Sequence, residues 1–330
     1  MMAGELWRQT FQIGKETTPG TTVAATRKMY FTPDSTLSRE RDPRPHRFAT
    51  ASRDNVRAFT LGPVAVGGTV KLPLSASEIL ELLLIGIKGA VTPTTPGGGT
   101  NSRLWTFTPS ATLDAATLEW DDGANVWEAG GCYVNKLKFS GAANEEAMVE
   151  AEIFGMNLAA TTLTGALTDR TPDFMEGWET KVFIDAFEGT PGTTQVTGTL
   201  VNWEVEIDNQ MGRKYFAANT NATGAVTIGE LEVKAKLTIE ASASQADTEF
   251  TNWNAATKRL IRLDHGNNEL IEGALYKFVT IDLPGAWEAF DLGGEDEGTR
   301  VYELSLQYVY DPTNAFGLQI RAQNARTAAY

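Results

Sequence analysis

The clearest pattern in the chain is strict alternation of apolar and polar positions. Between residues 230 and 241, apolar side chains occupy every second position: Leu231, Val233, Ala235, Leu237 and Ile239. A period of two places successive side chains on opposite faces of a β-strand, so one face is buried and the other meets solvent or a partner. The same period recurs at 66–74, 201–208 and 299–310, and further strands are expected at 103–109, 115–121, 132–140, 146–154, 258–263, 269–283 and 316–322. The pattern predicts a mainly β protein with a minor α component.

Two short helices are predicted among the strands. Ser75 and Glu78 stand three residues apart before an apolar run, which is typical of a capping box at a helix start. The run 79–84 that follows predicts a short buried helix, and a second short amphipathic helix is expected near 246–257. Each helix comes directly after a long strand.

The order of elements is similar in the two halves of the chain. Each half has strands, a long strand that ends in a short helix, and then more strands. We therefore predict two tandem β domains, at 1–175 and 176–330, with the second ending in an arm formed by 311–330. The alternative stays open that any chain with strands and two helices can be divided in this way.

The segment 34–57 has a different composition from the rest. From Ser35 to Arg57 it holds six arginines against three acidic residues, and it also contains Pro43 and Pro45. No hydrophobic period is visible in it. The segment is predicted to be a long loop, because an unpatterned stretch of this length is usually either functional or disordered.

Composition removes several classes of function. The 330 residues carry a formal net charge of −14 without a uniform basic face, which disfavours DNA binding of the usual kind. Cys132 is the only cysteine, so neither an intramolecular disulfide nor a cysteine metal cage can form. His46 and His265 are the only histidines, and neither has a nucleophile motif near it. We expect no enzymatic activity, no cofactor and no metal site.

Two segments resemble a known family. Residues 13–26 read IGKETTPGTTVAAT, a G-x-E-x-x-x-G-T stretch before a strand, and residues 67–74 form a strand that runs straight into an apolar helix. These features and the layout of the whole chain are similar to those of the major tail tube proteins of long-tailed (siphovirus-type) bacteriophages.

The resemblance implies both a fold and an assembly. Each domain would be a β-sandwich or barrel with a short flanking helix, and subunits would join edge to edge into rings with a continuous inner β-barrel. Rings would stack into a tube that conducts DNA into the host without binding it specifically. Two domains per chain favour a trimeric, pseudo-hexameric ring, with a hexamer as the alternative.

The resemblance also implies partners and a location. The partners would be other copies of the chain, the tape measure protein, the tail terminator and the distal tail protein, with no membrane. The protein would be assembled in the host cytoplasm and would reside in the tail of the virion.

Two sets of residues are candidates for roles in such a tube. Arginines on the 34–57 segment are predicted to contact acidic groups of the neighbouring ring: Arg39, Arg41, Arg44 and Arg47. Acidic residues on polar strand faces are predicted to line the lumen: Glu204, Glu206, Asp208, Glu230, Glu232 and Glu240. A solvated loop and an ordinary solvated strand face are the alternatives.

Two other functions remain compatible with the sequence. The chain could be another virion β-protein, such as a capsid decoration or tail-tip component. It could also be a carbohydrate-binding β-sandwich, because eight tryptophans are available to stack on sugars. Most of these tryptophans fall within strand or helix patterns, which favours core packing instead.

Overall fold

The computed structural model describes residues 6–217, 222–241 and 243–330. Its first half contains a 3-10 helix (Leu6–Arg8), β1 (Thr10–Glu16), β2 (Arg27–Met29), β3 (Thr36–Arg47), β4 (Val56–Pro73), α1 (Leu80–Gly86), β5 (Arg103–Phe107), β6 (Ala115–Asp121), β7 (Val126–Ala142), β8 (Met148–Gly155) and β9 (Asn157–Ala160). Its second half contains a 3-10 helix (Gly177–Glu179), β10 (Thr180–Ala186), β11 (Gln195–Val196), β12 (Leu200–Asp208), β13 (Gly212–Lys214), β14 (Ala225–Thr227), β15 (Glu232–Glu240), α2 (Ala243–Asn254), β16 (Arg259–Glu272), β17 (Leu275–Asp296), β18 (Thr299–Tyr308) and β19 (Gln319–Asn324). The prediction of a mainly β protein with two short helices is confirmed.

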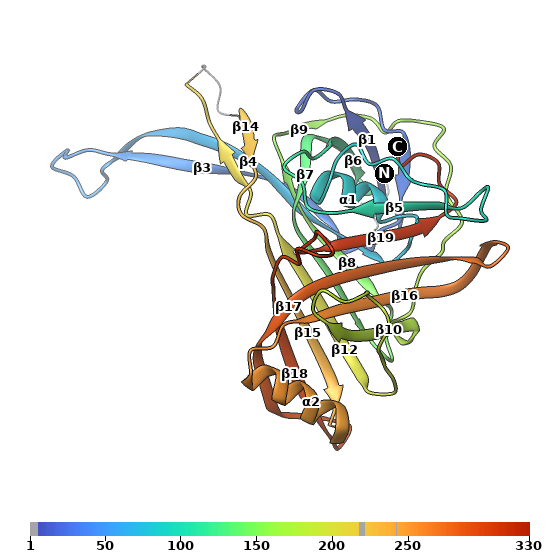
Figure 1. Cartoon of the computed structure of the whole chain (residues 1–330). Helices are drawn as coiled ribbons and strands as arrows, with labels where there is room; N and C mark the ends of the chain where they lie inside the picture. The colour runs from blue at the N-terminus through green and yellow to red at the C-terminus, as the bar shows by residue number, and fades with distance from the viewer. Residues whose placement is uncertain (1–5, 218–221, 242) are drawn as a thin grey trace.

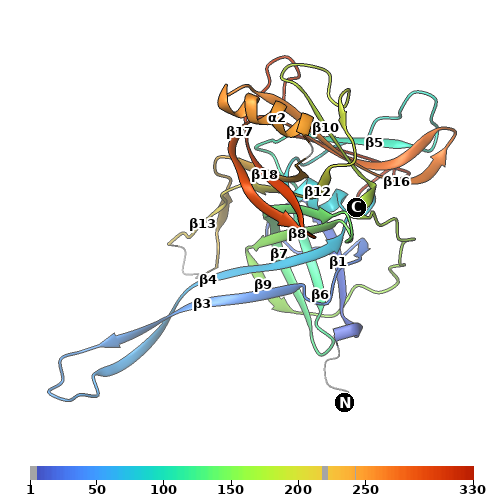
Figure 2. The same ribbon diagram turned by 90° about the horizontal axis from the view of Figure 1, so that it is seen from below.

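The centre of the molecule is an antiparallel sheet with strand order β3-β4-β8-β7-β12-β15-β18-β17. Figure 2 shows β3 and β4 at one end of this sheet, and β17 and β18 with α2 at the other. One face of the sheet is buried and the other is polar, as the alternation predicted. Among the described residues this sheet does not close into a barrel, because the two end strands do not pair with each other.

Two long strands each belong to two sheets. The first part of β7 lies between β6 and β9 in a side sheet with order β2-β1-β6-β7-β9, and its second part, from Tyr133, joins the central sheet. Likewise, the first part of β17 lies between β16 and β19, in the order β11-β10-β16-β17-β19, and from Gly285 onward β17 pairs with β18. β5 extends the second side sheet by pairing with β19.

The two halves therefore share one order of pairing. In the first half the order is β3-β4-β8-β7-β6-β1-β2, and in the second it is β12-β15-β18-β17-β16-β10-β11. The boundary predicted near residue 175 falls between β9 and the second 3-10 helix. The halves are not separate bodies, because β7 pairs directly with β12 along seven residues of each strand.

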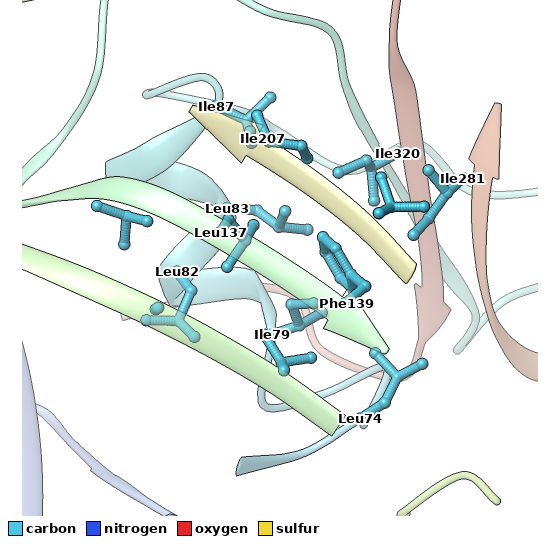
Figure 3. Packing of buried hydrophobic residues seen from close by; sticks show 14 of the residues in the cluster. Leu74, Ile79, Leu82, Leu83, Ile87, Leu137, Phe139, Ile207, Ile281 and Ile320 are labelled. Carbon is cyan, nitrogen blue, oxygen red and sulfur yellow. The ribbon is translucent and has the colours of Figure 1, made fainter. Parts of the chain in front are cut away.

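The main hydrophobic core fills the space between the central sheet and α1. Figure 3 shows Leu83 of α1 beside Leu137 of β7, and Ile87 beside Ile207 of β12. Every residue of α1 is buried, which explains why this short segment is apolar except for Glu81. Side chains from the second side sheet, such as Ile281 and Ile320, complete the same cluster.

The arginine-rich segment is a β-hairpin, and the prediction of an unstructured loop was wrong. β3 and β4 pair along their length, and the hairpin projects well beyond the body of the molecule (Figure 1). Both faces of the projecting part meet solvent, so no alternation of apolar and polar residues marks its strands. Pro43 and Pro45 are tolerated because β3 is an edge strand, where a missing N–H need not break a ladder.

The C-terminal segment packs on its own chain, which differs from the predicted arm. Its strand β19 pairs with β17 and β5, and Arg326 Nη2 lies 2.6 Å from Glu81 Oε1 of α1. Arg170, from the connection between the halves, binds the same carboxylate and also Glu78. Burial raises the pKa of Glu78 to about 7. Buried carboxylates require cationic partners. The ion pairs with Arg326 and Arg170 therefore hold the C-terminal segment and the connection between the halves against α1.

Candidate functional site

A charged surface covers the exposed face of the central sheet. Lysines and carboxylates alternate across five neighbouring strands in one cross-strand row: Lys71, Glu150, Lys138, Glu206 and Lys234. Neighbouring rows add ion pairs, with Lys138 Nζ 2.7 Å from Glu204 Oε2 and Lys136 Nζ 3.0 Å from Asp208 Oδ2. Opposite charges that face each other on adjacent strands stabilise a sheet modestly. We call this surface the charged face.

The predicted lumen acids mostly lie on the charged face. Five of them belong to it through β12 and β15: Glu204, Glu206, Asp208, Glu232 and Glu240. Glu230 precedes β15 in an exposed connection and is not part of the strand row. The lysines of β7 that oppose these acids were not among the predicted residues. Their alternation at 136 and 138 was visible, but nothing in the sequence showed that β7 pairs with β12.

The ion pairs of the charged face shift the pKa values of its members. A hydrogen bond from Lys234 lowers the pKa of Glu232, and the same contact raises the pKa of Lys234. Asp208 and Glu206 raise the pKa of Lys136. Each shift favours the charged form, so at neutral pH the face carries both signs in close alternation. Fields from such a surface cancel over short distances and are further screened by salt.

The projecting β3–β4 hairpin exposes two large apolar side chains on one of its faces. Phe59 and Leu61 of β4 stand opposite Pro45 and Pro43 of β3, and they are 60% and 50% exposed. On the other face, His46 Nε2 lies 2.8 Å from Thr60 Oγ1. Large exposed apolar side chains close together usually mark a contact surface. The projecting part, from Pro43 to Leu61, is called the hairpin tip below.

The four candidate arginines do not form a single patch. Arg39 and Arg41 lie near the base of the hairpin, opposite Val66 and Val64. Arg44 is on the polar face of the hairpin tip, where its Nε donates to Asp42 Oδ2 over 2.9 Å. Arg47 reaches Asn55 across the end of the hairpin, with 3.2 Å between Nη1 and Oδ1. All four are exposed, so each remains available to a partner.

The base of the hairpin is braced by the second half of the chain. The guanidinium of Arg213, on β13, stacks over the Phe154 ring at 3.6 Å and donates to the carbonyl of Val66. Tyr215 Oη donates to the carbonyl of Val64 over 3.1 Å. Figure 1 shows β13 and β14 beside the point where the hairpin leaves the body. The bracing fixes the direction in which the hairpin tip projects.

The two end strands of the central sheet have one paired side each. Among the described residues, β3 pairs only with β4, and β17 beyond Gly285 pairs only with β18. An unpaired strand edge presents a row of N–H and C=O groups that can template another strand. These two edges are therefore open to pairing with a further strand.

Residues with potential for catalysis or metal binding lie in structural positions. His265 is fully buried, shares a 2.9 Å hydrogen bond with Thr180, and has its pKa lowered to about 3 by burial. Burial also raises the pKa of the Cys132 thiol, which keeps it unreactive. Within residues 6–217, 222–241 and 243–330, no group of three or more histidine, cysteine or acidic residues is arranged to hold a metal ion. No helix of that part of the chain is both long and apolar enough to cross a membrane.

Comparison with known protein families identifies a match over most of the chain. Residues 7–271 match the sequence model of a family described as phage tail tube protein. The matched region spans most of the chain, from η1 through β16. No curated protein matches the chain.

Proposed function

The chain belongs to the phage tail tube protein family, and from this we propose that its copies assemble into stacked rings that form a DNA-conducting tube. Membership makes the protein a structural component of the virion tail. The observation that carries the proposal of assembly is the pair of open strand edges at the two ends of the central sheet. A molecule with two such edges can finish its hydrogen bonding with further copies.

The nature of the two edges supports the proposal of a ring. They belong to different strands, so pairing one with the other in the next copy makes a head-to-tail contact. Contacts of this kind generate a ring when the rotation between copies closes. Closure would convert the central sheets of all copies into one barrel without edges.

The charged face is the proposed lining of the lumen. In a closed ring, the buried face of the central sheet must lie outward, because α1 and both side sheets cover it. The polar face then lies inward, with Glu204, Glu206, Asp208, Glu232 and Glu240 among its carboxylates. A lining with more carboxylates than lysines repels phosphate weakly, and the alternation leaves no basic groove for DNA. DNA would pass without specific binding.

The hairpin tip is the proposed contact between rings. It carries exposed apolar residues on one face and Arg44 and Arg47 near its end. A projection of this length reaches beyond its own subunit (Figure 1), and its braced base holds it in one direction. Phe59 and Leu61 would bury apolar surface on the next ring, while the arginines would pair with its acidic groups. This modifies the four-arginine hypothesis, because Arg39 and Arg41 lie at the base instead.

The repeated pairing order supports a ring of three copies. Each half supplies four strands to the central sheet, so one chain presents two equivalent units. We infer a duplicated chain, for which a ring of six units needs three copies. The tape measure protein, tail terminator and distal tail protein are the proposed partners at the lumen and at the tube ends.

Negative-stain electron microscopy of the purified, concentrated protein tests this function. The proposal expects rings with a central channel that stack into tubes. Size-exclusion chromatography with light scattering gives the mass of the smallest closed species. A protein that stays a compact monomer at millimolar concentration would rule out assembly from this chain alone.

A further inference from the structure

The pairing of β7 with β12 inside the chain is a template for the contact between chains. This inference rests on the proposed ring and names the two edges and the register that close it. The internal joint connects the last strand of the first four-strand unit (β3-β4-β8-β7) to the first strand of the second (β12-β15-β18-β17). The outer edges of the same two units are β3 and the second part of β17.

The two units can be aligned residue by residue. β7 carries a bulge at Asn135, between Val134 and Lys136, and β17 carries one at the corresponding place, between Trp287 and Ala289. From the residue before each bulge, a cross-strand row runs to the far edge of the unit. The first row is Val134, Ile153, Gly68 and Leu37; the second is Trp287, Leu306, Ala235 and Val205.

The alignment sets the equivalent positions at each edge. Leu37 of β3 corresponds to Val205 of β12, and both are buried on the core side. Leu137 and Phe290 are each the second residue after the bulged position of their strands, and Phe139 and Leu292 are each the fourth; β17 has a further register shift between Asp291 and Gly294, which β7 lacks. The helices agree, because Leu83 of α1 lies beside Leu137 while Phe250 of α2 packs against Phe290, with 5.6 Å between ring centroids.

Burial differs sharply between the equivalent residues. In the internal joint, Leu83, Leu137 and Phe139 are completely buried, because Val205 and Ile207 of β12 cover them. At the outer edge, Leu292 is 49% exposed and Phe250 is 39% exposed, and Phe290 is half-buried. Phe250, Phe290 and Leu292 therefore form an exposed apolar strip along β17 and α2. At the internal joint, β12 covers the equivalent side chains. Such a strip beside an unpaired edge fits a strand whose inner face can cover apolar side chains, either with apolar residues or with the aliphatic stems of arginines.

We propose that β3 of a second copy of this chain pairs antiparallel with the second part of β17, in the register of the internal joint. Val205 pairs with Phe139 in that joint, so Leu37 pairs with Leu292. The register then places Ser38 opposite Asp291 and Arg39 opposite Phe290. Leu37 covers the apolar strip, and Arg39 occupies the position of Ile207, with its aliphatic stem and guanidinium over the Phe290 and Phe250 rings.

Charge supports a second copy as the occupant of this edge. β3 is rich in arginine, and in the proposed register its Arg39 and Arg41 lie beside Asp291 and Glu288 of β17. The basic strand and the acidic edge lie at opposite ends of one sheet, as Figure 2 shows, so they meet only between copies. Pairing β3 with β3, or β17 with β17, would instead bring charges of the same sign together, which costs free energy.

Disulfide trapping tests the proposed register. In antiparallel strands, consecutive facing pairs alternate between hydrogen-bonded and more closely spaced non-hydrogen-bonded geometry, so two adjacent pairs are tested. The variants are S38C/D291C and L37C/L292C, each in the full-length protein, where native Cys132 is buried. The control S38C/A289C is shifted by two residues on the same face, which places its sulfurs beyond bonding distance.

Under mild oxidation, at least one in-register pair is expected to form intermolecular disulfides more than tenfold faster than the shifted pair. Covalent species are read on non-reducing gels, and ring formation is followed by electron microscopy in parallel. Rings without cross-linking of either in-register pair would overturn the proposed edges while leaving the tube function intact. Intermolecular cross-linking of the single variant S38C or D291C would show that β3 pairs with β3, or β17 with β17, and would contradict the proposal. A disulfide within one monomer would show that the two edges meet in the same chain, which also contradicts it. Absence of any assembly would overturn the joint together with the ring.

Discussion

The internal β7–β12 joint and the two outer edges of the central sheet use equivalent strands in different surroundings. At the internal joint, Phe139 and Val205 are fully buried, whereas Leu292 stands half-exposed at the position equivalent to Phe139. Strand pairing and the covering of apolar side chains are thus complete within the chain at the internal joint, whereas both are missing at the outer edges. The contrast supports a role for burial at the first site in the stability of the fold, and for burial at the second in the proposed assembly.

Truncation at the internal joint should have the largest effect on the single chain. Phe139→Ala removes a fully buried aromatic ring, and losses of about 3–5 kcal/mol in the free energy of unfolding are typical of such changes. Urea unfolding of dilute, unassembled protein measures the loss. Leu292→Ala at the equivalent outer position should change the same quantity by less than about 0.5 kcal/mol. Similar losses from both variants would remove the distinction between the two sites.

Charge placed at the outer edge should abolish rings without unfolding the chain. Leu292→Asp puts a carboxylate where Leu37 of the next copy is proposed to lie, and burial of an unpaired charge is strongly unfavourable. We expect a folded monomer by circular dichroism and light scattering. Leu270→Asp is the matched control, because Leu270 is 53% exposed near the β16–β17 turn, away from the edge. Normal rings from Leu292→Asp would refute the joint.

Changes at the hairpin tip should separate ring formation from stacking. Phe59→Ser combined with Leu61→Ser removes the exposed apolar pair, and rings should persist while mean tube length in micrographs falls about tenfold or more. Arg44→Ser with Arg47→Ser should shorten tubes less, because exposed ion pairs contribute little. Tubes of normal length from the apolar variant would assign stacking to another surface.

A change at Glu78, a buried carboxyl remote from both edges, should have the smallest effect on assembly. The pKa of Glu78 is about 7 in the folded protein, above its ordinary value of 4.5. The folded state therefore keeps a proton that the unfolded chain releases, and stability falls as pH rises from about 4.5 to about 7. Between these two values the free energy of unfolding should fall by on the order of 1 kcal/mol per pH unit. Glu78→Gln should flatten this part of the curve, measured by urea unfolding across pH, and leave ring formation unchanged. A wild-type curve that rises over this range would contradict the assignment.

The sequence predicted the strands with one buried face more accurately than the rest. Alternation located β12, β15 and β18, and the apolar run after Ser75 located α1. It failed for β3, whose projecting part has solvent on both faces and therefore lacks a hydrophobic period. The periodicity of apolar residues also carries no information on which strands pair, so the lysines of β7 opposite Glu204 and Glu206 were missed. The equivalence of β7 with β17 emerged only from the order of strand pairing and the matching bulges.

The most direct test of edge-to-edge assembly is a cryo-electron microscopy map of one ring at a resolution that separates strands. We predict three copies, with β3 of each beside the second part of β17 of the next, Leu37 facing Leu292, and the charged face toward the channel. A ring in which either strand keeps a solvent-exposed edge, or in which the charged face points outward, would contradict this assembly.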